Sequence, residues 1–163
     1  MRFDPEFRRL CEEEYGAVYR SVFLLCRRPD VAEEATQEAF VRALERWGRL
    51  RSKPWAGGWV TTTALNVARR LLRKRRDLGV AVSDEDQDAD EALALWDAVS
   101  RLPLRQQQAV VLYYRLGFPA AQVAEAMGTR EPTIRAYLAR ARQTLERHLE
   151  EEHDGARPDH LAP

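Results

Sequence analysis

The sequence predicts an all-α protein made of two small helical domains joined by a flexible acidic linker. Apolar residues recur three and four positions apart through most of the chain, as they do in amphipathic helices. The 163 residues include only 8 glycines and 8 prolines, which leaves room for long helices. An acidic stretch without helical periodicity, residues 78–91, separates two groups of such segments. We therefore expect domains at residues 5–77 and 92–150, followed by an acidic tail at 151–163.

Three helices are expected in the first domain. The first covers residues 6–26. Asp30 is placed to cap the second, residues 31–47, whose inner stripe includes Phe40 and Leu44. Residues 48–58 contain Pro54 and glycines and are interpreted as a loop. The third helix begins near position 55 or 59 and ends at position 76.

Four helices are expected in the second domain, which is shorter than the first. They cover residues 93–101, 104–115, 119–127 and 131–150. Pro103 opens the second of them, since proline is tolerated in the first turn of a helix. Gly128 and Thr129 form the turn before the last one. The acidic tail beyond it is expected to be disordered, because it is polar and rich in turn-forming residues.

The net charge of zero conceals a strong separation of charge along the chain. Residues 42–76 hold 11 basic side chains against a single acidic one, Glu45. Residues 77–100 hold 8 acidic side chains and no basic one, and a second basic region follows at 101–149. Two basic regions of this density indicate a polyanionic partner.

The second basic region contains a helix-turn-helix pattern. A short helix with small residues, a turn at Gly128 and a longer helix with an apolar seam follow one another between positions 120 and 145. In this motif the first residues of the second helix meet base edges in the major groove, and later arginines reach phosphates. The base-reading candidates are Arg130, Glu131, Thr133 and Arg135, and the phosphate candidates are Arg140 and Arg142. The alternative is a pair of helices with a solvated basic face.

The first basic region combines tryptophans with cations and polar side chains. Flat aromatic faces beside cations and amides are suited to holding unstacked bases and a single-stranded backbone. The candidates are Arg51, Trp55, Trp59, Asn66, Arg69, Arg70, Arg73 and Lys74. The alternative is that tryptophans such as Trp47 and Trp59 anchor the core while the arginines solvate a helix end.

Four segments in this order resemble the extracytoplasmic-function (ECF) sigma factors of bacterial RNA polymerase. They are residues 30–44, residues 59–73, residues 102–112 and the helix-turn-helix, and the resemblance covers about residues 5–149. It implies two helical domains, binding to core RNA polymerase and promoter DNA, and promoter melting at the start of transcription. It also implies an anti-sigma factor for many members, although no residue here identifies one.

The resemblance implies a role for each candidate surface. An acidic and amide stripe on the second helix docks on the polymerase, which implicates Glu34, Gln37 and Glu38. The loop at residues 48–55 captures a flipped base of the −10 element, and the third helix contacts the melting strand. The last helix reads the −35 element. The residue types alone, without the resemblance, also predict that DNA bases bind at these two places, the first basic region and the start of the last helix.

The chain departs from the family pattern at two places. Asn66 is preceded by Leu65 where the family has arginine, and Arg70 stands where the family has aspartate. The recognition helix opens with Arg130-Glu131-Pro132-Thr133 and lacks the usual hydroxyl cap. Glu131 is the candidate to replace that cap.

Other function classes have little support in the sequence. The histidines show neither metal-ligand spacing nor a partner nucleophile, so we expect no enzyme, no cofactor and no metal site. No apolar run is long enough for a membrane span and no signal peptide opens the chain, so we expect a cytoplasmic protein without membrane insertion. The alternative function is a regulator that occupies an operator without polymerase. We also expect the two domains to move independently about the linker.

Overall fold

The structure is a computed structural model that describes residues 4–80 and 91–155, and all of its regular elements are helices. The first region, residues 4–80, holds α1 (Pro5–Cys26), α2 (Pro29–Glu45), α3 (Trp47–Leu50) and α4 (Ala56–Asp77). The second region, residues 91–155, holds α5 (Glu91–Ser100), α6 (Leu104–Val110), the π-helical turn η1 (Val111–Arg115), α7 (Ala120–Met127) and α8 (Glu131–Gly155). The predicted all-α fold class is confirmed.

The first helix begins and ends where its local sequence dictates. The backbone N–H of Glu6 donates to the carboxylate of Asp4 over 2.9 Å, which satisfies one of the free donors at the start of α1. Arg27 follows the helix with φ of 55°, a left-handed residue whose N–H donates to the carbonyl of Phe23. Val18 and Val22 are buried on the inner face of α1.

Asp30 does not cap the second helix, contrary to the prediction. α2 begins one residue earlier, at Pro29, and Arg28 is its N-cap residue without a side-chain cap. The carboxylate of Asp30 accepts a hydrogen bond from Arg75 near the end of α4 over 2.5 Å. Asp30 therefore links α2 to α4. The spacing of residues along α2 alone cannot predict such a contact.

The segment expected as one loop contains a helix of its own. α3 follows α2 almost directly, and α4 begins at Ala56 within the predicted loop. Leu50 anchors α3 in the core and is only 3% exposed. Leu44, predicted on the inner stripe of α2, is 37% exposed, whereas Phe40 on the same helix is buried as predicted.

The second predicted helix of the second region, residues 104–115, changes its helical form midway. α6 ends at Val110, and the next five residues form a π-helical turn in which the N–H of Leu116 donates to the carbonyl of Val111. The wider turn keeps Leu112 buried while Tyr113 and Tyr114 face solvent. Gly117, with φ of 74°, then reverses the chain toward α7.

The last helix is longer than predicted. α8 continues to Gly155, so the first five residues of the predicted tail are helical. Glutamates are good helix formers, and residues 150–152 contain no glycine or proline to stop the helix. The rest of the tail, 156–163, and most of the predicted linker, 81–90, lie outside the described residues.

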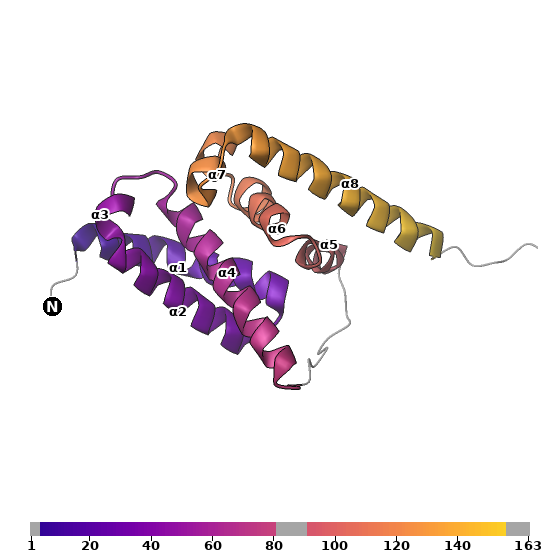
Figure 1. The fold of residues 1–163 in the computed structure, drawn as a ribbon, viewed down its shortest axis with the longest axis horizontal. Coiled ribbons are helices and arrows are strands. Elements are labelled where there is room, and N and C mark those ends of the chain that lie inside the picture. Colours follow the sequence, from indigo (N-terminus) through magenta and orange to yellow (C-terminus); the bar gives the residue numbers. More distant parts are fainter. Residues whose placement is uncertain (1–3, 81–90, 156–163) are drawn as a thin grey trace, which may run out of the picture.

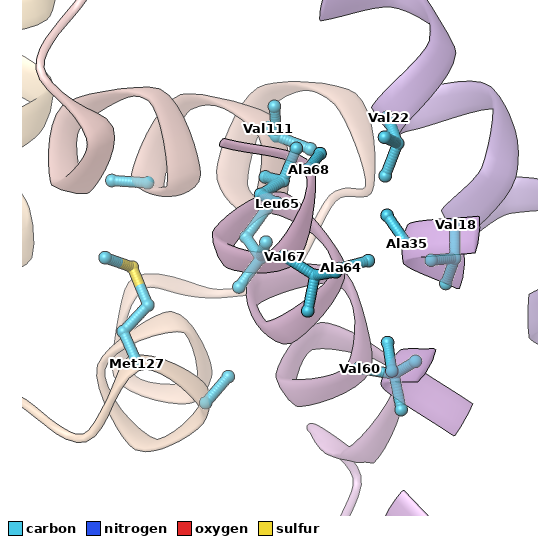
Figure 2. Close-up of a cluster of buried hydrophobic side chains, with 14 of the residues drawn as sticks. Val18, Val22, Ala35, Val60, Ala64, Leu65, Val67, Ala68, Val111 and Met127 are labelled. Carbon is cyan, nitrogen blue, oxygen red and sulfur yellow. The ribbon is translucent and has the colours of Figure 1, made fainter. Parts of the chain in front are cut away.

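The two regions lie side by side and share one continuous core. α4 packs against α1 and α2 on one side and against α6 and α7 on the other (Figure 1). Figure 2 shows apolar side chains from both regions, including Val18, Val22 and Met127, gathered around Ala64 and Leu65 of α4. α4 therefore contacts both halves, and α1 also packs against α5 of the second region.

Candidate nucleic-acid interface

The residues predicted to touch single-stranded DNA lie mainly along one stripe of α4. At about 100° per residue, positions 59, 66, 70 and 73 fall within roughly 60° of one another around the helix axis. Asn66, Arg70 and Arg73 are exposed, and Trp59 is half-buried. Arg69 and Lys74 flank this stripe. One face of α4 thus presents an aromatic ring, an amide and several cations.

The stripe is tied to the predicted polymerase-binding helix by an ion pair. The guanidinium of Arg70 donates to both carboxylate oxygens of Glu38 on α2, over 3.0 and 2.9 Å. Arg42 holds the same carboxylate from the next turn of α2. Partial burial of Glu38 acts to raise its pKa, but the hydrogen bonds and charges of Arg70 and Arg42 outweigh it and lower the pKa below 4.5. The carboxylate therefore stays ionised and braces α2 against α4.

The other candidates of the first basic region lie near the start of α4. Arg51 is half-exposed and pairs with Glu6 over 3.2 Å and with Asp4 over 3.8 Å at the start of α1. Trp55 directly precedes α4 and is half-buried. Arg46 lies over the ring of Trp59 at 5.8 Å. Neither tryptophan is fully buried, so each combines packing with an accessible face.

An open pocket lies where α2 meets α3. Its volume is about 460 Å³, and it is lined by Glu45, Arg46, Gly48 and Arg49. It lies beside the segment, residues 48–55, that was predicted to hold a flipped base. Of that segment, only its first two residues line the pocket.

The predicted polymerase-binding residues share an exposed face of α2. Glu34 and Gln37 are exposed, and the amide of Gln37 donates to Glu33 over 3.3 Å. Val41 and Leu44, which sequence analysis did not select, are 56% and 37% exposed one and two turns further along α2. Leu44 was predicted on the inner, buried stripe of α2, so its spacing in the sequence did not indicate that it faces solvent. The face is therefore partly apolar and suits a protein partner better than DNA.

The helix-turn-helix of the second region is present. α7 ends at Met127, Gly128 adopts φ of 66°, and α8 begins at Glu131. Glycine adopts this left-handed backbone conformation at little cost in energy, whereas a residue with a side chain is strained in it. Ile134 and Leu138 are buried and fix α8 to the rest of the region. The structure thus orients the first turns of α8 by packing.

The predicted base-reading residues cluster at the start of α8. Arg130 and Arg135 are exposed, whereas Glu131 and Thr133 are half-buried. The carboxylate of Glu131 accepts a hydrogen bond from Arg135 one turn later, over 2.5 Å. Glu131 is thus engaged with Arg135, the side chain predicted to read a base beside it. Arg140 is exposed further along α8, where its carbonyl accepts from Thr144.

The structure brings the candidates together in two sets, one in each region. The amide of Asn66 on the α4 stripe meets the second region directly, because the amide of Gln108 donates to its side-chain oxygen over 2.7 Å. In the set at the start of α8, Arg130 and Arg135 remain exposed. Sequence analysis did not select Gln108, since a buried glutamine gives no signal of its long-range partners.

Neither a metal site nor a membrane-spanning helix is found within residues 4–80 and 91–155. Those ranges hold no group of three or more His, Cys, Asp or Glu side chains placed to bind a metal ion. None of the helices there combines the length and apolarity that a membrane span requires.

Comparison with protein families matches both regions. The family profile described as Sigma-70 region 2 matches residues 10–77. The profile described as Sigma-70, region 4 matches residues 92–145. Together the two profiles account for most of both described regions.

Individual proteins show the same similarity. The ECF RNA polymerase sigma factor BldN of Streptomyces coelicolor is 32% identical over 158 residues, covering 88% of this chain, and the chain spans 60% of the length of BldN. The ECF RNA polymerase sigma factor SigM of Mycobacterium tuberculosis is 29% identical over 154 residues, covering 90% of this chain and 76% of SigM. The solved structure of the sigma factor RpoE of Bartonella quintana, in complex with the anti-sigma factor NepR, has the same fold with a TM-score of 0.67 at 21% identity. That match covers 90% of this chain and 98% of RpoE.

Proposed function

Because this chain belongs to the ECF sigma factors of the sigma-70 family, we propose that it binds core RNA polymerase, recognises the −35 and −10 elements of promoters and promotes their melting. The observation that carries the proposal is the pair of exposed surfaces, one on each region, whose chemistry fits double-stranded DNA at α8 and single-stranded DNA at α4. An operator-binding regulator has no need of the second surface.

Core polymerase is proposed to bind the exposed face of α2. Glu34, Gln37 and Glu38 supply charge and amide groups there, and Val41 and Leu44 supply apolar area. A mixed face of this kind can bury apolar surface while its polar groups select the partner. We expect the apolar pair to supply affinity and the acidic residues to supply specificity.

The −10 element is proposed to bind the stripe of α4 and the segment before it. Stacking of a base on an aromatic side chain contributes about 1–3 kcal/mol, and each phosphate contact adds affinity that depends on salt. Flipping a base out of the duplex costs a few kcal/mol. Trp55, Trp59 and the cations of the stripe can together offset that cost, which supports a role in melting.

The −35 element is proposed to bind the first turns of α8. A bidentate contact between arginine and guanine contributes about 1–3 kcal/mol of discrimination. Arg130 and Arg135 are exposed and can make such contacts, and Arg140, which is exposed further along α8, is proposed to contact a phosphate. Glu131 already pairs with Arg135, so we expect it to orient that arginine.

Further parts of the proposal follow from family membership. Sigma factors direct a polymerase and carry no catalytic centre, so the chain is proposed to act without enzyme activity, cofactor or metal. Its place of action is the cytoplasm, where polymerase and DNA meet. An anti-sigma factor is the remaining partner proposed.

The test is run-off transcription with core RNA polymerase and fragmented genomic DNA. We expect specific transcripts only when the chain is added. Arg135→Ala should weaken them by impairing −35 recognition, and Gln37→Ala with Glu38→Ala should weaken them by impairing polymerase binding.

Matched control variants distinguish the loss of a specific binding surface from a general change in the charge of the chain. Arg101→Ala removes another exposed arginine that pairs with a carboxylate one turn away on its helix. Glu12→Ala with Glu13→Ala removes two exposed carboxylates from α1. Both controls should transcribe like the unmodified chain. If no transcripts appear while the chain alone still protects DNA from cleavage, the proposed function is wrong and an operator-binding regulator takes its place.

A further inference from the structure

The π-helical turn η1 presents two tyrosines to solvent next to α8. Tyr113 and Tyr114 are 37% and 51% exposed. Their rings meet edge to face with the centroids 4.9 Å apart, which is a favourable arrangement for two aromatic side chains. From α8, the guanidinium of Arg142 donates to the hydroxyl oxygen of Tyr114 over 2.8 Å. The turn and the helix are therefore linked at the surface through a tyrosine that sequence analysis did not select.

The linked pair retains hydrogen-bond donors and an unneutralised charge. A tyrosine hydroxyl can donate as well as accept, and Arg142 uses only its accepting side, so the hydroxyl hydrogen of Tyr114 stays available. The guanidinium has several more N–H donors and no acceptor. In the part of the chain that the structure describes, no carboxylate pairs with Arg142, whereas Arg135 on the same helix is paired with Glu131. The pair is therefore suited to an anion that can accept from both groups.

Helical geometry places Arg142 on the same side of α8 as Arg135. Seven positions separate the two arginines, so at about 100° per residue they differ by only about 20° around the helix axis. At about 1.5 Å per residue, Arg142 lies about 10 Å further along that axis. Arg140 follows Arg135 by five positions and points about 140° away from it. Of the two phosphate candidates, Arg142 is therefore the one aligned with the proposed base-reading arginine.

The dimensions of the major groove place phosphates close to Arg142 when Arg135 contacts a base. In a helix-turn-helix the first residues of the second helix contact base edges at the floor of the groove. The groove is about 12 Å wide and about 8.5 Å deep. A side chain about 10 Å behind Arg135 on the same side of the helix is therefore level with the wall of the groove, where the phosphates lie. Tyr114 reaches the same wall, because it is bonded to Arg142.

The chemistry of this surface favours DNA over a protein as its partner. Tyrosine and arginine are also enriched in protein interfaces, where their flat apolar surfaces supply most of the affinity. Such an interface would have little use for an unpaired guanidinium and a free hydroxyl hydrogen side by side. A phosphate oxygen can accept from both groups, and a hydrogen bond to an ionised acceptor is stronger than one between neutral groups. The position beside the proposed −35 surface agrees with a phosphate of the DNA backbone.

We propose that Tyr114 and Arg142 form a clamp for one phosphate of the DNA backbone at the edge of the −35 element. Arg142 supplies the charge, while Tyr114 orients the guanidinium and donates its hydroxyl hydrogen to the same phosphate. The proposal rests on the proposed function, because it adds a contact to the proposed −35 surface. It also gives a binding role to the π-helical turn, which lies outside the two helices of the helix-turn-helix.

The salt dependence of DNA binding tests the charge supplied by Arg142. Fluorescence anisotropy measures the affinity of the full chain, bound to core polymerase, for promoter DNA at several salt concentrations. Arg142→Ala should weaken binding by about fivefold or more and lower the slope of log affinity against log salt by about one. Arg142→Lys should keep the slope but lose about threefold in affinity, because an ammonium group lacks the fixed fork of donors. Arg147→Ala, another exposed arginine of α8, is the matched control and should change neither quantity.

Removal of a single hydroxyl tests the role of Tyr114. Tyr114→Phe keeps the ring and should weaken DNA binding by about threefold to tenfold, without loss of helix by circular dichroism. In a chain that already carries Arg142→Ala, the same substitution should have a smaller effect, because part of the role of the hydroxyl is to hold Arg142. Equal effects in both backgrounds would mean that the two side chains act independently and would contradict the clamp. Tyr137→Phe removes a half-buried hydroxyl from another face of α8 and is the matched control.

A change of DNA sequence distinguishes a phosphate contact from base reading. Phosphate contacts carry no sequence information, so their loss weakens binding to every sequence by the same factor. Arg142→Ala and Tyr114→Phe should therefore cost the same factor on a promoter and on a variant promoter whose −35 element has been scrambled. Arg135→Ala should cost more on the intact promoter than on the scrambled one, because its proposed contact is to a base.

The outcomes separate this inference from the proposed function. The inference is wrong if Arg142→Ala leaves the salt slope unchanged, or if Tyr114→Phe binds DNA as tightly as the unmodified chain. It is also wrong if either variant weakens binding to core polymerase instead, which would assign the surface to a protein contact. Failure of the unmodified chain with polymerase to bind promoter DNA would overturn the proposed function. The same variants would then be compared as free chains on duplex DNA at low salt, where unchanged slope and affinity would overturn the inference as well.

Discussion

The two regions arrange their arginines in different ways. In the first region, most of the described ion pairs join different parts of the fold, as Arg70 does with Glu38 and Arg75 with Asp30, although Arg42 pairs with Glu38 within α2. In the second region, the described ion pairs join residues one turn apart on one helix, as in Arg135 with Glu131. A pair between helices supports tertiary structure, whereas a pair within a helix contributes only about 0.3–0.5 kcal/mol. The proposed binding of DNA would therefore compete with contacts between helices at α4, but only with a pair inside one helix at Arg135.

Two glycines, one from each region, also differ in what the backbone requires of them. Gly128 in the second region has φ of 66° and makes the turn of the helix-turn-helix. Gly48 in the first region lies in α3 with open space around the position of a Cβ atom. The first glycine is required by backbone conformation, and the second is not.

The largest expected effect comes from creating a cavity in one region at a time. Ile134→Ala in the second region and Leu50→Ala in the first should each lower the free energy of unfolding by about 2–5 kcal/mol, since both side chains are buried. Hydrogen exchange followed by mass spectrometry should show the loss of protection mainly in the region that carries the substitution. Equal loss in both regions would show that they unfold as a single unit.

The next effect distinguishes base reading at α8 from phosphate binding at α4. Arg135→Ala should weaken binding of the polymerase-bound chain to promoter DNA by about 1–3 kcal/mol, because a base contact is lost. Lys74→Ala should weaken it less and reduce the slope of affinity against salt by about one. Fluorescence anisotropy at several salt concentrations measures both quantities. A large change in slope for Arg135→Ala would place that residue on a phosphate.

A smaller effect tests the contrast between the two glycines. Gly128→Ala should cost about 1–2 kcal/mol, because a side chain is strained in the left-handed conformation. Gly48→Ala should stabilise the chain by about 0.4–1 kcal/mol, because it removes conformational freedom from the unfolded state without a clash. Thermal or urea unfolding of the two variants measures the difference. Destabilisation of equal size by both would contradict the contrast.

The smallest effect concerns the ion pair between Asp30 and Arg75 in acid. The hydrogen bond from Arg75 lowers the pKa of Asp30 below its ordinary value of 3.8. The stabilisation is therefore complete above that value and is lost as the pH falls through the pKa of the folded protein. It should amount to less than about 1 kcal/mol, because the carboxylate of Asp30 is largely exposed to solvent.

Comparing variants across pH isolates this contribution. At pH 7 Asp30→Asn should be slightly less stable than the unmodified chain, and the two should converge as the pH falls below 3.8. Glu12→Gln, which changes an exposed carboxylate of α1, is the control. A difference between Asp30→Asn and the unmodified chain that is the same at every pH would exclude the ion pair as its cause.

Much of the fold and both candidate surfaces could be predicted from the sequence, because they depend on local patterns. The 3.6-residue period located the major helices, and Gly128 located the turn between α7 and α8. The helical spacing of Trp59, Asn66, Arg70 and Arg73 is enough to place them on one stripe of α4. Their roles in binding DNA remain predictions.

The sequence by itself therefore determined the all-α class, the order of the helices and the two basic surfaces, since periodicity and charge are properties of neighbouring residues. Only the tertiary structure decided that Asp30 binds Arg75 instead of capping α2, that Leu44 faces solvent and that Arg70 is held by Glu38. It also decided that Gln108 meets Asn66 across 42 positions of sequence. Such contacts depend on how helices pack, because which side chains meet across two helices is fixed by their distance and crossing angle, and not by spacing within either one.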